Sequence, residues 1–120
     1  MAYFPDNSVD NAVCRVGWLD SGHPFTTGAA EDEFLSKLKQ LYRTRVNEMR
    51  GYHICEFCPQ PIFGIPMDLD GNTIKLGSAE IHLTTSANGK FAAPDLIYHY
   101  VVAHGYLPPQ KFIEAVKNLV

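Results

Sequence analysis

The chain has 120 residues, of which 46% are hydrophobic and 19% charged, so it can bury a core and is not disordered. Its 13 acidic and 10 basic residues give a net charge of −3, which argues against binding to nucleic acid or membranes through bulk charge. The sequence has no apolar run of about 18 residues, the length that predicts a membrane-spanning helix, and no secretory signal pattern. We therefore expect one cytoplasmic domain over residues 1–120.

The first half of the chain predicts two regular elements and a loop-rich middle. Residues 12–19 are rich in β-forming residues and predict a strand. Apolar residues at three- and four-residue spacing predict a helix over 30–46, with acidic residues at its start and basic residues after them. Residues 52–55 are expected to form a short strand. Residues 59–72 hold prolines and glycines and are expected to form loops with one hairpin.

The second half predicts a hairpin. Residues 78–85 alternate between apolar and polar side chains, which is typical of a half-buried strand. Asn88-Gly89 is a strong hairpin turn signal, and residues 90–93 form the expected returning strand.

Two further helices are predicted at the end of the chain. Pro94 suits the first position of a helix that ends near His104, where Gly105 offers a left-handed stop. A third helix is expected to start near Pro108-Pro109. Strands and helices do not alternate regularly, so the sequence predicts an α+β domain with a small antiparallel sheet and about three helices.

Cys55-x-x-Cys58 has the spacing in which a tight turn directs two sulfurs at one metal ion. The chain has three cysteines and five histidines, so this pair indicates a metal or redox site rather than a disulfide. Zinc takes four thiolate or imidazole ligands, and His99 and His104 are candidates for the other two. Five helical steps rotate them apart by about 140°, so they converge only if the helix opens near its end.

Two other histidines compete as ligands, because His53 lies two residues before the first cysteine and His82 is a weaker candidate. A catalytic zinc keeps one position open for water and needs a carboxylate base, for which Glu56 or Glu80 is available. Up to five nitrogen and sulfur ligands are at hand, so we expect a closed structural zinc site, a zinc knuckle that holds the loop-rich residues 51–77 onto the helices.

Two alternatives to zinc remain open. In the first, both cysteines are small buried side chains, and His104 occupies the end of a helix, where a cation is favoured. In the second, the pair is a redox site. Such a pair usually opens a helix, whereas Pro59, Pro61 and Gly64 follow here. Cys14 lies in the predicted first strand and is expected in the core.

Four segments are distinctive as a set: Tyr3 to Asp6, Val16 to Phe25, Gly51 to Cys58 and Ala92 to Tyr106. Together they resemble a family of small bacterial proteins without an established activity, over residues 3 to about 118. The most specific part is His-Tyr-Val-x-x-His-Gly-Tyr-x-Pro-Pro. The resemblance implies a bacterial source and a stand-alone domain, and it lends no enzyme class. Because it places a His-x-Cys-x-x-Cys segment and a His-x4-His helix in one small protein, it favours zinc.

Our leading hypothesis is a zinc-stabilised domain that is not an enzyme and binds another protein. An adaptor- or immunity-like role fits its small size and acidic charge. The alternative is a zinc-dependent hydrolytic enzyme with a metal-bound water, and the third hypothesis is a domain without metal. Tyr98, Tyr100 and Tyr106 surround the helix over 94–104 and serve either as core or as a contact surface for a partner.

Overall fold

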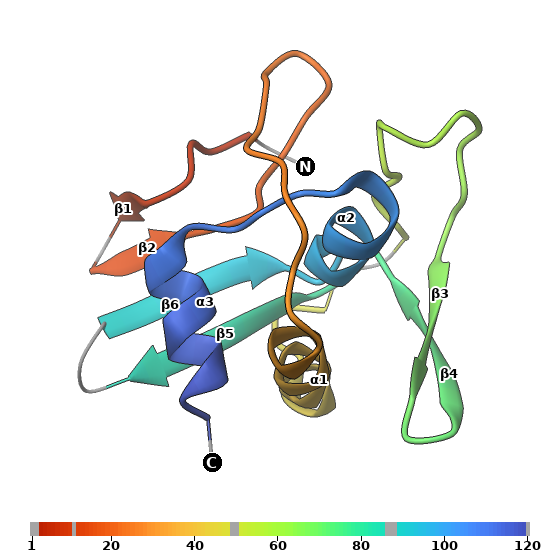
Figure 1. The fold of residues 1–120 in the computed structure, drawn as a ribbon. Coiled ribbons are helices and arrows are strands. Elements are labelled where there is room, and N and C mark those ends of the chain that lie inside the picture. Colours follow the sequence, from red (N-terminus) through yellow and green to blue (C-terminus); the bar gives the residue numbers. More distant parts are fainter. Residues whose placement is uncertain (1–2, 11, 49–50, 86–88, 120) are drawn as a thin grey trace.

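The computed structural model describes residues 3–10, 12–48, 51–85 and 89–119 (Figure 1). Four strands form one sheet in the order β1-β2-β6-β5. These strands are β1 (Ser8–Asp10), β2 (Val13–Arg15), β5 (Glu80–Thr85) and β6 (Gly89–Pro94). The predicted α+β class is confirmed, but the sheet is mixed, because β2 pairs with β6 in parallel while the other two pairings are antiparallel.

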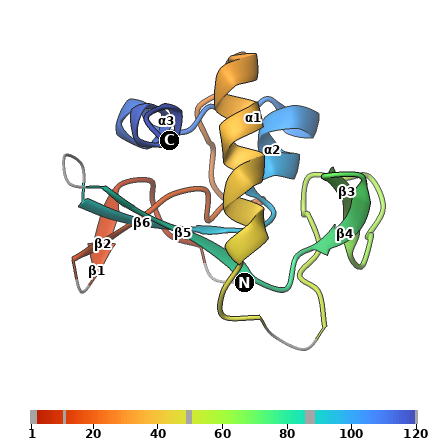
Figure 2. The same ribbon diagram turned by 90° about the horizontal axis from the view of Figure 1, so that it is seen from below.

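Three α-helices lie on one side of this sheet (Figure 2). They are α1 (Asp32–Leu41), α2 (Ile97–His104) and α3 (Gln110–Lys117). A separate hairpin of β3 (Ile65–Leu69) and β4 (Asn72–Leu76) stands beyond α2 (Figure 1). It confirms the hairpin that was expected in this stretch, although β4 continues past the predicted range.

The core between the sheet and the helices is rich in aromatic rings. Phe34 of α1 and Phe91 of β6 both meet Phe112 of α3, with ring centroids 6.2 and 5.6 Å apart. All three side chains are almost fully buried. The predicted apolar stripes of α1 and α3 therefore face each other over the sheet, as the helical spacing of these residues requires.

The first predicted helix is shorter than expected. Its α-helical part ends at Leu41, and a 3-10 turn (Tyr42–Thr44) follows. The chain then leaves the helix because Val46 exchanges two backbone hydrogen bonds with Glu80 of β5, with N···O distances of 2.9 and 2.8 Å. Pairing with the sheet edge thus replaces the last helical turn. The first predicted strand is also shorter, since β2 covers only Val13–Arg15.

Residues 52–55, expected as a short strand, form a loop. Its backbone is held where the His53 N–H donates to the Gly77 carbonyl oxygen at 2.8 Å. A side chain on Gly77 would clash with the backbone carbonyl oxygen of His53, because an added Cβ would lie 2.5 Å from that oxygen. Gly77 also has a positive φ of 116°. A glycine therefore lets the two segments approach closely.

The predicted start of the second helix is wrong. Pro94 is the last residue of β6 and pairs with Glu80, and α2 begins only at Ile97. The intervening Asp95 is fully buried. Its carboxylate accepts hydrogen bonds from the Gly77 N–H at 2.8 Å and from Arg45 at 3.1 Å, and its own N–H donates to Ala79. These long-range bonds hold the residue outside the helix.

The expected end of α2 and the expected start of α3 are confirmed. Gly105 follows α2 with a left-handed φ of 68°, and α3 begins directly after Pro109. Along β5, Ile81 and Leu83 are buried while His82 is exposed, as the alternation predicted. The turn residue Asn88 lies outside the described residues. In the described part of the chain, no helix is long and apolar enough to cross a membrane.

Candidate metal centre

Four predicted ligands meet at one place in the fold. Cys55 and Cys58 lie on the loop segment before β3, His99 lies within α2, and His104 is the last residue of α2. One ligand atom from each lies within 4.8 Å of every other. Cys55 is buried, and the other three are half-buried. The group can therefore hold a metal ion.

The spacing of the sulfur and nitrogen atoms fits zinc. Cys58 Sγ lies 3.2 Å from His99 Nε2 and 3.5 Å from His104 Nε2, and Cys55 Sγ lies 3.3 Å from His104 Nε2. A tetrahedral zinc ion with bonds of about 2.3 Å to sulfur and about 2.05 Å to nitrogen would separate these atoms by about 3.6 Å. The observed distances fall within about 0.4 Å of that value.

The two histidines converge at the end of α2. Their ring centroids lie 5.0 Å apart, at an interplanar angle of 79°. His104 is the final helical residue, and the left-handed Gly105 after it turns the chain so that the Tyr106 N–H donates to the Tyr100 carbonyl oxygen. The convergence expected near the helix end is therefore present.

The two cysteines lie on a tight turn. The Cys58 N–H donates to the Cys55 carbonyl oxygen at 3.4 Å. Burial raises the pKa of Cys55 to about 11, and hydrogen bonds from the backbone N–H groups of Phe57 and Cys58 to its sulfur act in the opposite direction. These donors favour the thiolate, which is the form that binds a metal.

The electrostatics favour neutral imidazole at His99. Burial lowers its pKa, and the neighbouring His104 lowers it further. Neutral imidazole is the form that coordinates a metal ion. At neutral pH this histidine therefore needs to lose no proton before it binds zinc.

The residues between the two cysteines anchor the turn. Glu56 Oε1 accepts hydrogen bonds from the N–H and the hydroxyl of Ser21, at 3.0 and 2.8 Å. The Phe57 ring makes edge contacts with Phe25 and Tyr100, at centroid distances of 5.1 and 5.8 Å. It also lies 5.7 Å from the ring of His104. Nothing in the Cys-x-x-Cys spacing identified Phe57 as a packing residue of the site.

The remaining candidates lie outside the group of four. His53 is on the same loop segment, but among the described residues it is not part of the cluster. His82 Nε2 lies 2.9 Å from Glu80 Oε1 on the exposed side of β5. Glu56 and Glu80, the two candidate bases of a catalytic site, are thus bonded to Ser21 and to His82.

The tyrosines around α2 belong mainly to the core. Tyr100 and Tyr106 are almost fully buried, whereas Tyr98 is half-buried. The Tyr106 hydroxyl donates to the carboxylate of Asp6, with O···O distances of 2.9 and 2.8 Å. These two rings position the end of α2 and do not form an exposed contact surface.

Comparison with known proteins identifies one family. The family model described as Domain of unknown function (DUF7919) matches residues 1–117, which is almost the whole chain. No curated protein and no solved structure matches.

Proposed function

The chain belongs to the DUF7919 family of domains of unknown function, and we propose that it is a single zinc-stabilised domain that binds another protein. The observation that carries the structural role of zinc is the set of four protein ligands at one point. A structural zinc site is closed by four protein ligands, whereas a catalytic site leaves one position for water or substrate.

The loop segment 51–63 explains what zinc would stabilise. Cys55 is its one buried residue, and besides it only Phe57 and Cys58 pack against the core. A bound zinc would tie this segment to α2 through His99 and His104. Metal binding would then supply the free energy that burial of apolar side chains supplies elsewhere in the domain.

The same segment presents apolar side chains to solvent. Ile62 and Phe63 are 45% and 71% exposed. On α2, Val102 is 57% exposed and lines a groove of about 260 Å³ beside β3, together with Met67. Exposed apolar side chains next to a groove favour contact with another protein over contact with water.

Two further points support this proposal. A hydrolytic site needs a base beside the metal, and both candidate carboxylates are occupied by other partners. No disulfide joins Cys14, Cys55 or Cys58, which suits a reducing compartment, so we propose a cytoplasmic location.

The metal is tested on untagged protein purified without chelator. Elemental mass spectrometry should find about one zinc per chain, and X-ray absorption should find two sulfur and two nitrogen neighbours. Nitrogen and oxygen scatter almost alike, so the multiple-scattering signal of imidazole decides between the sites. Two imidazoles support the closed site, whereas one would favour the hydrolytic alternative. Absence of zinc after zinc is offered to the reduced protein would refute both zinc hypotheses.

The binding role is tested with a photo-crosslinking amino acid in cells. Placed at Phe63 it should trap one discrete protein. Placed at Val9, which is 68% exposed but lies on β1, it should not. If neither position yields a product, or if both yield the same mixture, the binding proposal fails while the zinc result still stands.

A further inference from the structure

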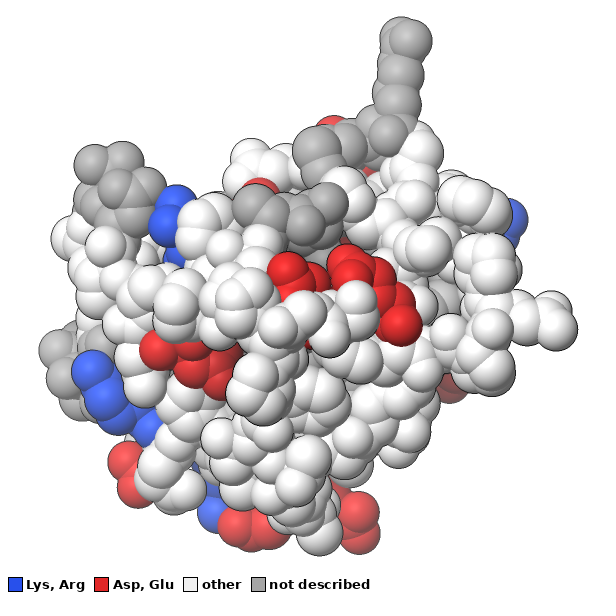
Figure 3. All heavy atoms as spheres, turned by 90° about the horizontal axis from the view of Figure 1, so that it is seen from above, with Lys and Arg blue, Asp and Glu red and all other residues white. Residues whose placement is uncertain are grey.

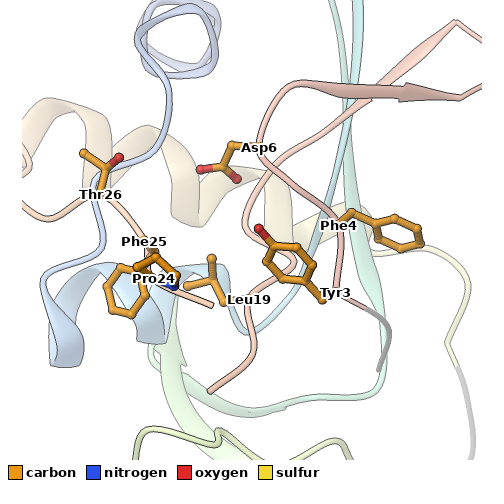
Figure 4. A pocket seen from close by; sticks show the side chains of 7 residues that line it. All are labelled: Tyr3, Phe4, Asp6, Leu19, Pro24, Phe25 and Thr26. Atoms are coloured by element: carbon orange, nitrogen blue, oxygen red, sulfur yellow. The ribbon is translucent and has the colours of Figure 1, made fainter. Parts of the chain in front are cut away.

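A hollow lies beside the N-terminal segment, and none of the metal-site residues lines it. It has a volume of about 360 Å³ and is lined by aromatic, apolar and polar residues from two stretches near the N-terminus: Tyr3, Phe4, Asp6, Leu19, Pro24, Phe25 and Thr26. Its volume lies within the range of about 300–1,000 Å³ that small-ligand sites occupy. Figure 4 shows the Asp6 carboxylate directed toward the space between Thr26, Phe25 and Tyr3, whereas the Phe4 ring points away.

Two hydrogen-bond donors hold the Asp6 carboxylate in this hollow. Its Oδ1 accepts a hydrogen bond from the Gly17 N–H at 3.0 Å. The Tyr106 hydroxyl donates to the same carboxylate, 2.9 Å from Oδ1 and 2.8 Å from Oδ2. Both donors are uncharged, so they hold the carboxylate in place without neutralising it. A carboxylate accepts about four hydrogen bonds, so lone pairs remain for a ligand.

The aromatic walls of the hollow are also held in place. The Tyr3 ring stacks on His23 with centroids 3.7 Å apart and an interplanar angle of 6°. His23 Nδ1 in turn lies 2.7 Å from Asp20 Oδ1. On the other side, Phe25 packs against Tyr106 at 5.8 Å. Aromatic faces attract cations, so these rings and the carboxylate favour the same kind of ligand.

The charge of the molecule has the same electrostatic preference. Viewed from above, acidic side chains lie in the middle of the face and along its lower edge, and Lys and Arg lie near its margins (Figure 3). The whole chain carries a net charge of −3. The overall charge therefore favours the approach of cations over that of anions.

We propose that this hollow binds an alkylammonium group, either of a free amine or of a lysine side chain, with Asp6 as the acceptor. Ammonium is favoured over guanidinium because Asp6 Oδ1 already accepts the Gly17 N–H. A guanidinium fork needs both carboxylate oxygens, whereas an ammonium group is a point charge that needs one. The inference is independent of the zinc proposal, because none of the four metal-site residues lines the hollow.

The test is a titration of 15N-labelled protein, followed by NMR, with n-butylammonium and with the neutral n-pentanol. The Gly17 amide reports directly on Asp6, so the amine should shift its resonance saturably and the alcohol should not. Asp6→Asn should weaken amine binding at least about tenfold, since a hydrogen bond to a charged group is lost. Equal binding of amine and alcohol, or unchanged amine binding by the variant, would overturn the proposal.

A second variant covers the case in which Asp6→Asn does not fold. Tyr3→Ala removes a wall without touching the bonds of Asp6 and should weaken binding about twofold to fivefold. Tyr52→Ala removes a tyrosine that is 38% exposed and does not line the hollow, and it should bind like the unaltered protein. Equal binding by Tyr3→Ala and the unaltered protein would contradict the aromatic contribution and the assigned site.

A third titration separates the two sources of the amine. Nα-acetyl-lysine-N-methylamide presents the ammonium group as a protein would. Binding of this compound together with n-butylammonium supports an alkylammonium site open to both sources. Binding of only one supports the site and identifies its source. Binding of neither overturns the proposal, whatever the zinc content of the protein.

Discussion

Replacing Cys58 with serine gives the sharpest test of the metal group. Cys58 Sγ lies 3.2 and 3.5 Å from the two histidine nitrogens, so it is central to the proposed zinc coordination. It is only half-buried, and without metal it would lose no more than weak hydrogen bonds, worth less than about 1 kcal/mol. A large loss of stability therefore requires a bound metal.

The expected size of that loss follows from the thermodynamics of structural zinc. Such sites contribute about 10–16 kcal/mol at a 1 M standard state. At about 1 µM free zinc the concentration term removes about 8 kcal/mol, which leaves about 2–8 kcal/mol of folding free energy. For a chain of this length about 1 kcal/mol corresponds to roughly 3–6 °C, so Cys58→Ser should lower the melting temperature by at least about 6 °C.

Cys14→Ser is the matched control. Cys14 is 8% exposed, and its thiol donates to Asn7 at 3.6 Å, so a serine hydroxyl there costs about 1–3 kcal/mol with or without metal. Thermal unfolding followed by circular dichroism should rank Cys58→Ser as the less stable variant in zinc. In chelator the ranking should invert. The same ranking in both conditions, or equal losses for Cys14→Ser, Cys55→Ser and Cys58→Ser, would refute a structural zinc.

Three further predictions use other features of the fold. Because burial raises the pKa of Cys55 to about 11, metal binding at pH 7 should release at least one proton, and zinc affinity should fall as the pH is lowered. Calorimetry in buffers of different ionisation enthalpy measures the number of protons released. Gly77→Ala should lower the free energy of unfolding by about 3 kcal/mol or more, because the added Cβ would clash with the His53 carbonyl oxygen. Gly71 also has a positive φ but has open space around it, so Gly71→Ala should lower the free energy by only about 1 kcal/mol. Denaturant titrations measure both losses. Zinc-loaded protein should unfold in one transition that is the same by circular dichroism and by Trp18 fluorescence, and two separated transitions would contradict a single domain.

Local patterns in the sequence correctly predicted features that depend on residues close together in the chain. The helical spacing of Phe112 and Val116 identified the buried face of α3, and the alternation along residues 80–85 identified the buried face of β5. Gly105 identified the end of α2 because a left-handed residue is easiest for glycine. The Cys-x-x-Cys and His-x4-His spacings likewise selected the four residues that meet in space.

Long-range contacts produced the features that the sequence analysis missed. Nothing near Pro94 reveals that the following Asp95 will accept hydrogen bonds from Gly77 and Arg45, and these bonds delay the start of α2. Nothing near Val46 reveals its pairing with β5, which shortens the first helix. The parallel pairing of β2 with β6 joins residues more than 70 positions apart. Tertiary contacts override local propensity at each of these places.

The metal group and the Asp6 hollow are joined by a continuous set of packed rings. Phe57, between the two cysteines, contacts both His104 and Phe25. Phe25 contacts Tyr106, and the Tyr106 hydroxyl donates to Asp6. His104, one of the proposed metal ligands, ends α2, and Tyr106, the donor to Asp6, follows the left-handed turn after it. The orientation of the helix end therefore fixes the positions of both side chains. The metal ligands and the hollow therefore share this path of contacts, although none of the four metal ligands lines the hollow.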